Sequence, residues 1–172
     1  MTVDKSGQVQ ELGRRGLMLW AVGMLLLPAV AGAQAANRAT TEATSKGPLV
    51  EVWKSPTCGC CKEWVDHLET HGFRTRVHDT GNTAMRARLG MAEQYGGCHT
   101  ARVGGYAIEG HVPAADIQRL LKERPKAIGL AVPGMPVGSP GMDGPAYGGR
   151  RDAYEVLLVT GQDSASVFQS HR

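Results

Sequence analysis

The sequence lacks the features by which several large classes of protein are recognised. Its 172 residues carry 19 Lys and Arg against 16 Asp and Glu, a net charge of only +3, and no basic stripe is interleaved with aromatic residues. Nucleic acid is therefore not expected as a partner. The chain also has no Ser–His–Asp order, no phosphate-cradling loop, no prominent pair of carboxylates and no internal repeat. These absences leave its four cysteines as the main chemical signal.

The N-terminal region is typical of an export signal. Residues 1–13 are polar, Arg14 and Arg15 form a positive cluster, and an apolar run, GLMLWAVGMLLLPAVAG, ends at the small-residue site AQA. This order predicts a secretory signal peptide over residues 1–35, cleaved after Ala35. The paired arginines also loosely match a twin-arginine signal. An uncleaved membrane anchor is the alternative.

The rest of the chain predicts one α/β domain. Residues 36–48 are small and polar and form a flexible lead-in, and residues 49–172 form the domain. Hydrophobic periodicity predicts, in order, strand 49–53, helix 61–71, strand 73–80, helix 82–90, a hairpin at 101–108, helix 113–125 and strand 153–160. This order is the thioredoxin-like arrangement, a central mixed sheet flanked by helices. Residues 129–149 are rich in glycine and proline, so we expect a long loop without regular pairing.

Two of the cysteines have the spacing of a redox couple. Cys58 and Cys61 form a C-x-x-C motif at the turn into the first helix. Near the N-terminus of a helix the thiolate form is favoured over the thiol. Cys58 and Cys61 are therefore candidate catalytic residues for thiol–disulfide exchange.

Cys60 complicates that interpretation because it places a third sulfur inside the motif. A third thiol offers alternative pairings to a two-electron couple, whereas thiolates are the preferred ligands of soft ions such as Cu(I) and Zn(II). The adjacent sulfurs could also bridge several ions. Structural disulfides remain an alternative, as does a zinc site formed by three cysteines and His99.

The fourth cysteine lies in the loop that enters the hairpin, in the stretch GGCHT. In a thioredoxin-like fold this loop passes beside the N-terminus of the first helix. We therefore predict that Cys98 approaches the other three sulfurs, with His99 close behind. The alternative is that Cys98 is only a small buried side chain.

The sequence offers further candidate ligands outside the cysteines. Met135 and Met142 occur in the near-repeat PGMP and PGMD, and a thioether either binds Cu(I) or packs against the domain. His67 and His71 are spaced i, i+4 but lie among acidic residues, which favours an exposed helix face. The sequence gives His111 no obvious partner.

Three long motifs carry a resemblance to a known family. The stretches SPTCGCCKEWVDHLETHGF, CHTARVGGYAIEGHVPAADIQRLL and GLAVPGMPVGSPGMDG resemble the CopG-type copper-resistance family, over about residues 49–171. The resemblance implies a periplasmic, thioredoxin-like protein with a Cys-rich copper site. The matching metal ligands are Cys58, Cys60, Cys61, Cys98, Met135 and Met142.

These observations together predict a periplasmic Cu(I)-binding protein for copper resistance, with a thiolate-bridged site of several ions. The alternative is a thiol–disulfide or copper oxidoreductase that uses the Cys58 and Cys61 couple. The expected partners are copper ions and a periplasmic copper carrier, exporter or reductant. Neither nucleic acid nor, after signal cleavage, a membrane is expected.

Overall fold

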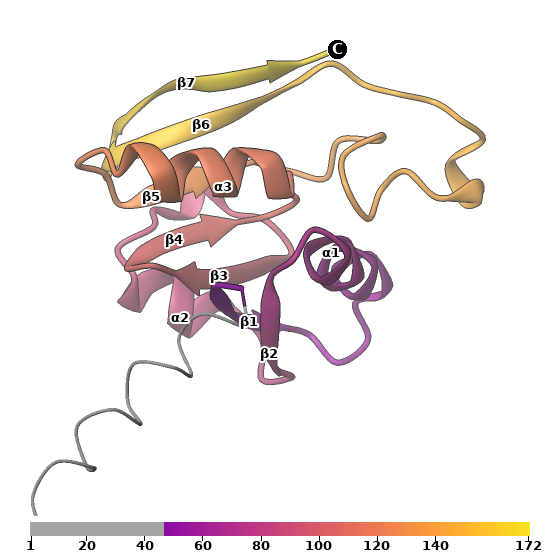
Figure 1. The fold of residues 1–172 in the computed structure, drawn as a ribbon, viewed down its shortest axis with the longest axis horizontal. Coiled ribbons are helices and arrows are strands. Elements are labelled where there is room, and N and C mark those ends of the chain that lie inside the picture. The colour runs from indigo at the N-terminus through magenta and orange to yellow at the C-terminus, as the bar shows by residue number, and fades with distance from the viewer. Residues whose placement is uncertain (1–46) are drawn as a thin grey trace, which may run out of the picture. The chain divides into compact units, whose positions relative to one another are not determined.

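A computed structural model describes residues 47–172 of the chain (Figure 1). The expected signal peptide and most of the expected lead-in lie outside the described residues. The strands are β1 Leu49–Lys54, β2 Arg74–His78, β3 His99–Val103, β4 Tyr106–Glu109, β5 Gly129–Ala131, β6 Tyr154–Gly161 and β7 Ser164–His171. The helices are α1 Gly59–Thr70, α2 Thr83–Arg88 and α3 Ala114–Glu123, with short 3₁₀ turns at Glu93–Tyr95 and Pro145–Tyr147. Within this part of the chain no helix is both long and apolar enough to cross a bilayer.

The strands form one mixed sheet in the order β2-β1-β3-β4-β5-β6-β7. The β1–β2 and β4–β5 pairs are parallel, and the other four pairs are antiparallel. The sheet and the helices confirm the predicted mixed α/β class. Because β3 pairs with β1, the chain that enters β3 returns to the end of β1 from which α1 starts. The topology therefore brings two separate cysteine-bearing segments together.

The first helix packs by the stripe that the sequence predicts. Cys61, Trp64, Val65 and Leu68 are its buried residues, spaced so that they share one face. The indole N–H of Trp64 donates to the carbonyl of Val112 at 2.8 Å. This hydrogen bond satisfies the polar group of a buried aromatic side chain. The middle of α1 is thus fixed against the segment that follows β4.

Two strands differ from the sequence prediction. β5 lies at the start of the stretch expected to be an unpaired loop, and β7 was not predicted at all. β5 forms because Gly129 lacks a side chain: a Cβ at this position would overlap the backbone of Ala107 on β4. β7 forms because it pairs along its length with β6. The remainder of the stretch, residues 132–149, belongs to the long loop beside α1 in Figure 1, with the short 3₁₀ turn Pro145–Tyr147 inside it.

Candidate metal centre

The N-terminus of α1 gathers three cysteines on four consecutive residues. Cys58 is the N-cap of the helix, and its N–H donates to the carbonyl of Ser55 at 3.1 Å. Cys60 and Cys61 follow within the first turn. The structure joins Cys58 and Cys61 in a disulfide, and Cys60 keeps a free, half-buried thiol. The C-x-x-C spacing therefore brings these two sulfurs within bonding distance, as a redox couple requires.

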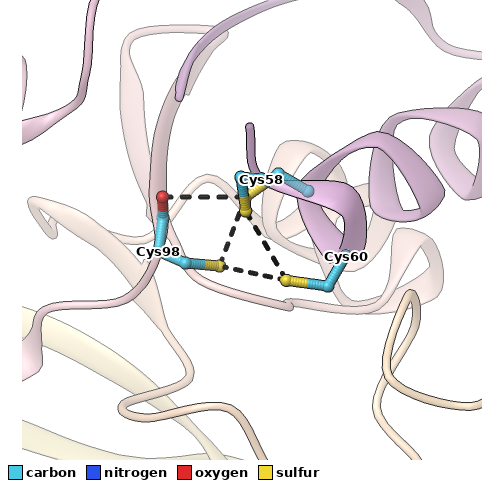
Figure 2. A group of neighbouring side chains, drawn as sticks. Cys58, Cys60 and Cys98 are labelled. Atoms are coloured by element: carbon cyan, nitrogen blue, oxygen red, sulfur yellow. Dashed lines mark hydrogen bonds between the residues drawn. A yellow bond between two sulfur atoms is a disulfide. The ribbon is translucent and has the colours of Figure 1, made fainter. Parts of the chain in front are cut away.

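Cys98 reaches this group from the loop before β3, which confirms its predicted approach. Its Sγ lies 3.4 Å from Sγ of Cys61 and 4.0 Å from Sγ of Cys60. Sγ of Cys60 is in turn 3.5 Å from Sγ of Cys58. All four sulfur atoms lie within 4.8 Å of one another. Figure 2 shows Cys58, Cys60 and Cys98 pointing toward a common centre at the end of α1.

Burial controls the charge of this sulfur group. Burial, together with the neighbouring Cys60, raises the pKa of the Cys98 thiol to about 12. Without a cation the thiol of Cys98 is therefore protonated at neutral pH. A bound metal ion removes this penalty because its positive charge offsets that of the thiolate. A metal ion bound by Cys98 would therefore displace the proton of this thiol.

His111 is a member of the site that sequence reasoning missed. Its Nε2 lies 3.0 Å from Sγ of Cys98, although the sequence offered no partner for it. Its Nδ1 lies 2.8 Å from the carbonyl oxygen of Pro140, which can only accept, so Nδ1 carries the proton. Burial lowers the pKa of His111, which favours the neutral ring. Its Nε2 lone pair is therefore directed at the sulfur group, as expected of a metal-binding imidazole.

His99 lies directly behind Cys98, as predicted. It is fully buried, its Nδ1 is 3.4 Å from Sγ of Cys98, and its ring lies against Trp64 with the ring centroids 4.2 Å apart. Burial, together with His111, lowers the pKa of His99 well below its ordinary value. Its Nε2 has no hydrogen-bond partner within residues 47–172. Cys98, His99 and His111 thus form a second set of potential ligands that shares Cys98 with the first.

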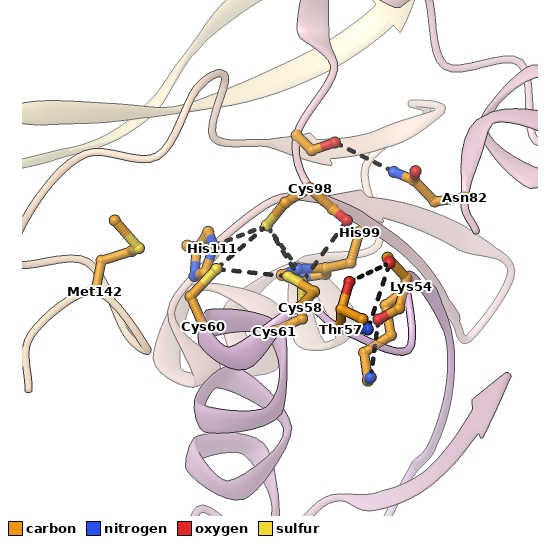
Figure 3. Close-up of a disulfide and its surroundings, with 12 residues drawn as sticks. Lys54, Thr57, Cys58, Cys60, Cys61, Asn82, Cys98, His99, His111 and Met142 are labelled. Carbon is orange, nitrogen blue, oxygen red and sulfur yellow. Dashed lines mark hydrogen bonds between the residues drawn. A yellow bond between two sulfur atoms is a disulfide. The ribbon is translucent and has the colours of Figure 1, made fainter. Parts of the chain in front are cut away.

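The glycine- and proline-rich loop lies against the first half of α1 and carries both predicted methionines. Gly141 has a φ of +84°, and a Cβ there would lie 2.8 Å from the backbone nitrogen of Trp64, so only glycine fits this close approach. The next residue, Met142, is buried, and its Sδ accepts a hydrogen bond from the hydroxyl of Tyr147 at 3.2 Å. Figure 3 shows Met142 on the side of the cluster where His111 and Cys60 lie. Met135, by contrast, is 53% exposed.

A hollow of about 290 Å³ opens beside Cys60. Glu63 of α1 and Asp143 and Tyr147 of the loop contribute to its lining. Cys60 is the one cysteine of the four that lines it, and Cys61 is fully buried. Cys60 is therefore the sulfur through which the cluster meets this hollow.

The other histidine pair does not belong to the site. His67 is half-buried, and its Nε2 accepts a hydrogen bond from the N–H of Ala114 at 3.1 Å, so it links α1 to the start of α3. His71 lies beside it, with the ring centroids 4.3 Å apart. The predicted exposed face thus holds for His71 and is wrong for His67. Neither ring is among the ligand groups at the sulfurs.

The fold and the site define a class: a small mixed α/β protein with a sulfur-rich group that could hold a metal ion. A family model described as "Protein of unknown function, DUF411" matches residues 95–142, which include Cys98 and His111. No curated protein matches the sequence.

Two solved structures match the fold. One, titled "Copper resistance protein copG- Form 1", is 45% identical, with 73% of this chain and 98% of that chain covered and a TM-score of 0.67. The other, titled Form 2, is 44% identical, with 74% and 100% covered and the same TM-score. The chain belongs to the CopG family of copper resistance proteins. Its relatives and its cysteine group together support a copper-related role.

Proposed function

We propose that this protein binds Cu(I) in the periplasm and serves copper resistance by holding the ion in its cysteine group. The observation that carries this proposal is the convergence of four sulfur atoms, from two chain segments, within 4.8 Å of one another. Thiolate sulfur is the donor that Cu(I) prefers over harder ligands. The neutral imidazole of His111 offers a further donor beside Cys98.

We also propose that the site holds more than one ion. Four thiolates around one ion would place four negative charges on a partly buried group, whereas each additional Cu(I) neutralises one of them. Because a thiolate has several lone pairs, each sulfur could bridge two ions. The short spacings from Cys98 to Cys61 and Cys60 suit such sharing.

The stoichiometry tests this proposal. The reduced protein is expected to take up more than one equivalent of Cu(I), and Cys60→Ser to lose most of that capacity, because Cys60 lies between Cys58 and Cys98. Anaerobic titration against a chromophoric Cu(I) chelator measures both values. Ile117→Val, a small change in the core beneath α3, serves as the folded control. An unchanged stoichiometry in Cys60→Ser would rule out a shared cluster.

The two methionines are proposed as further ligands with different requirements. Met142 is buried in the loop that contacts α1, and its thioether would give up the hydrogen bond from Tyr147 to bind copper. Met135 is exposed, so the loop would have to move for it to reach the cysteines. We therefore assign Met142 as the more direct ligand of the pair.

A second candidate function is a thiol–disulfide or copper oxidoreductase. The disulfide between Cys58 and Cys61 at the start of α1 favours it, because a helix N-terminus stabilises the thiolate that reduction releases. Such an enzyme would turn over a disulfide substrate or cycle copper between Cu(I) and Cu(II). The Cys60→Ser variant separates the two functions: it should keep disulfide turnover, whereas it should lose copper capacity.

The cellular setting is proposed on the same basis. The charged and apolar pattern of residues 1–35 is that of an export signal, which would place the domain of residues 49–172 in the periplasm, with a copper carrier, exporter or reductant as partner. We further propose that the fold is thioredoxin-like. The β2-β1-β3-β4 order, with α1 between the parallel pair and α3 after the hairpin, supports that assignment.

A further inference from the structure

The peptide groups on either side of Gly97, the residue before Cys98, are bound by side chains rather than by a neighbouring strand. The N–H of Gly97 donates to Oε1 of Glu109 on β4 at 2.7 Å. The carbonyl of Gly97 accepts from Nη2 of Arg86 at 2.9 Å and from Nδ2 of Asn82 at 3.2 Å. Both polar groups of residue 97 are therefore fixed in direction.

The same carboxylate also reaches the far side of Cys98. Glu109 is fully buried, and its Oε2 accepts from the hydroxyl of Thr100 at 2.6 Å. Its Oε1 also accepts from Nε of Arg86 at 2.9 Å, so a buried ion pair completes the group. One side chain thus binds residues 97 and 100, which flank Cys98 and His99.

Helix α2 contributes side chains that bind Gly97 and contributes no buried residue to the core. None of the residues of α2 is buried. Its N-cap Asn82 and its residue Arg86 lie one turn apart and both donate to the same carbonyl of Gly97. A buried ion pair costs desolvation energy that an apolar pair would avoid. The ion pair between Arg86 and Glu109 is explained if it serves to hold the direction of the chain at Gly97 rather than to stabilise the fold.

We propose that Arg86, Asn82 and Glu109 form a clamp on Gly97, called here the Gly97 clamp, which positions the sulfur of Cys98 against the cysteines of α1. The three are positioning residues, and the proposal rests on the proposed copper function. The clamp sets the 3.4 Å spacing between Cys98 and Cys61, which come from segments 37 residues apart. A site of this kind works only when its ligands are held within about 0.5 Å of their productive positions.

A disulfide equilibrium tests the clamp without copper. The full-length variant Cys58→Ser/Cys60→Ser keeps only Cys61 and Cys98, and the measurement is how readily these two thiols form a disulfide. In a glutathione buffer, these two thiols become one disulfide while one oxidised glutathione is reduced to two glutathione thiols, which take up the two protons. The equilibrium gives the effective concentration of Cys98 at Cys61. Glu109→Gln should lower that value about tenfold or more, since small displacements of reacting groups have effects of this size.

Two further variants separate positioning from stability. Arg86→Lys keeps the positive charge but has no planar fork to reach both Glu109 and Gly97, so it should lower the effective concentration of Cys98 at Cys61. Because it keeps the charge, this decrease should be smaller than that in the double variant Arg86→Met/Glu109→Gln. That double variant leaves no unpaired buried charge and should remain folded. Ile117→Val, a change in the core on α3, should leave the effective concentration of Cys98 at Cys61 equal to that of the background protein.

The outcomes decide the proposal in both directions. A graded loss of effective concentration, with a matching loss of Cu(I) affinity when the variants are placed in the otherwise unchanged protein, supports the clamp. If Glu109→Gln and the double variant, folded by near-ultraviolet circular dichroism, equal Ile117→Val in effective concentration, the clamp is only structural and the proposal is wrong. If the unaltered protein binds no Cu(I), the copper function fails, and the disulfide equilibrium still decides the clamp.

Discussion

Replacing Cys98 with serine should lower the affinity of the reduced protein for Cu(I) at least about 100-fold. Losing a residue that only hydrogen-bonds to a metal ligand costs about 10- to 100-fold in metal affinity, and losing a ligand itself should cost more. Cys98 is the sulfur that the second chain segment contributes, and it contacts Cys61, Cys60 and His111. Serine has nearly the same shape, but its hydroxyl oxygen is a poor ligand for Cu(I). The cysteine ligands that remain would be the three at the start of α1.

Competition with a Cu(I) chelator under anaerobic conditions measures this loss. The thermal midpoint of unfolding should change little in Cys98→Ser, because a half-buried thiol is replaced by a hydroxyl that His111 Nε2 can accept from. Ile117→Val again provides the control for small changes in stability. Should Cys98→Ser bind Cu(I) as tightly as the unaltered protein, the two segments would not share a site.

Oxidation of the protein should remove most of its copper capacity. The disulfide between Cys58 and Cys61 leaves Cys60 and Cys98 as the two free thiols, and a disulfide sulfur is a much weaker donor than a thiolate. With half of the thiolates gone, bridging between ions is lost as well. We expect the disulfide form to hold at most about half of the copper that the reduced form binds, in proportion to its thiolates.

Thiol counting and copper analysis on the same sample test this expectation. Protein treated with oxidised glutathione should show two reactive thiols and low copper, and subsequent treatment with a phosphine reductant should restore four thiols and the full copper content. The recovery on reduction is the control for damage during oxidation. Equal copper in the two forms would mean that Cys58 and Cys61 are not ligands.

The parts of the fold that follow local patterns were predictable from the sequence. The stripe of Cys61, Trp64, Val65 and Leu68 gave the buried face of α1, because a helix of this period has one apolar side. The meeting of Cys98 with α1 followed from the order of strands and helices, since β3 has to pair beside β1. Neither inference needed knowledge of a distant side chain.

The features that were missed depend on contacts between distant residues. His111 joins the site because the carbonyl of Pro140, 29 residues later, fixes its ring, and no local pattern marks such a pair. β5 is three residues long within a glycine-rich stretch, and its pairing depends on the close approach of Gly129 to Ala107. β7 has little apolar alternation and exists through its ladder with β6. Tertiary pairing outweighed local propensity in both strands.

X-ray absorption at the copper edge of the reduced, copper-loaded protein tests most directly whether the four sulfurs from two segments hold Cu(I). The account predicts an edge characteristic of Cu(I), a first shell made mainly of sulfur, and a copper–copper distance that disappears in Cys98→Ser. A first shell of oxygen and nitrogen alone, or a spectrum identical in the unaltered protein and in Cys98→Ser, would contradict it.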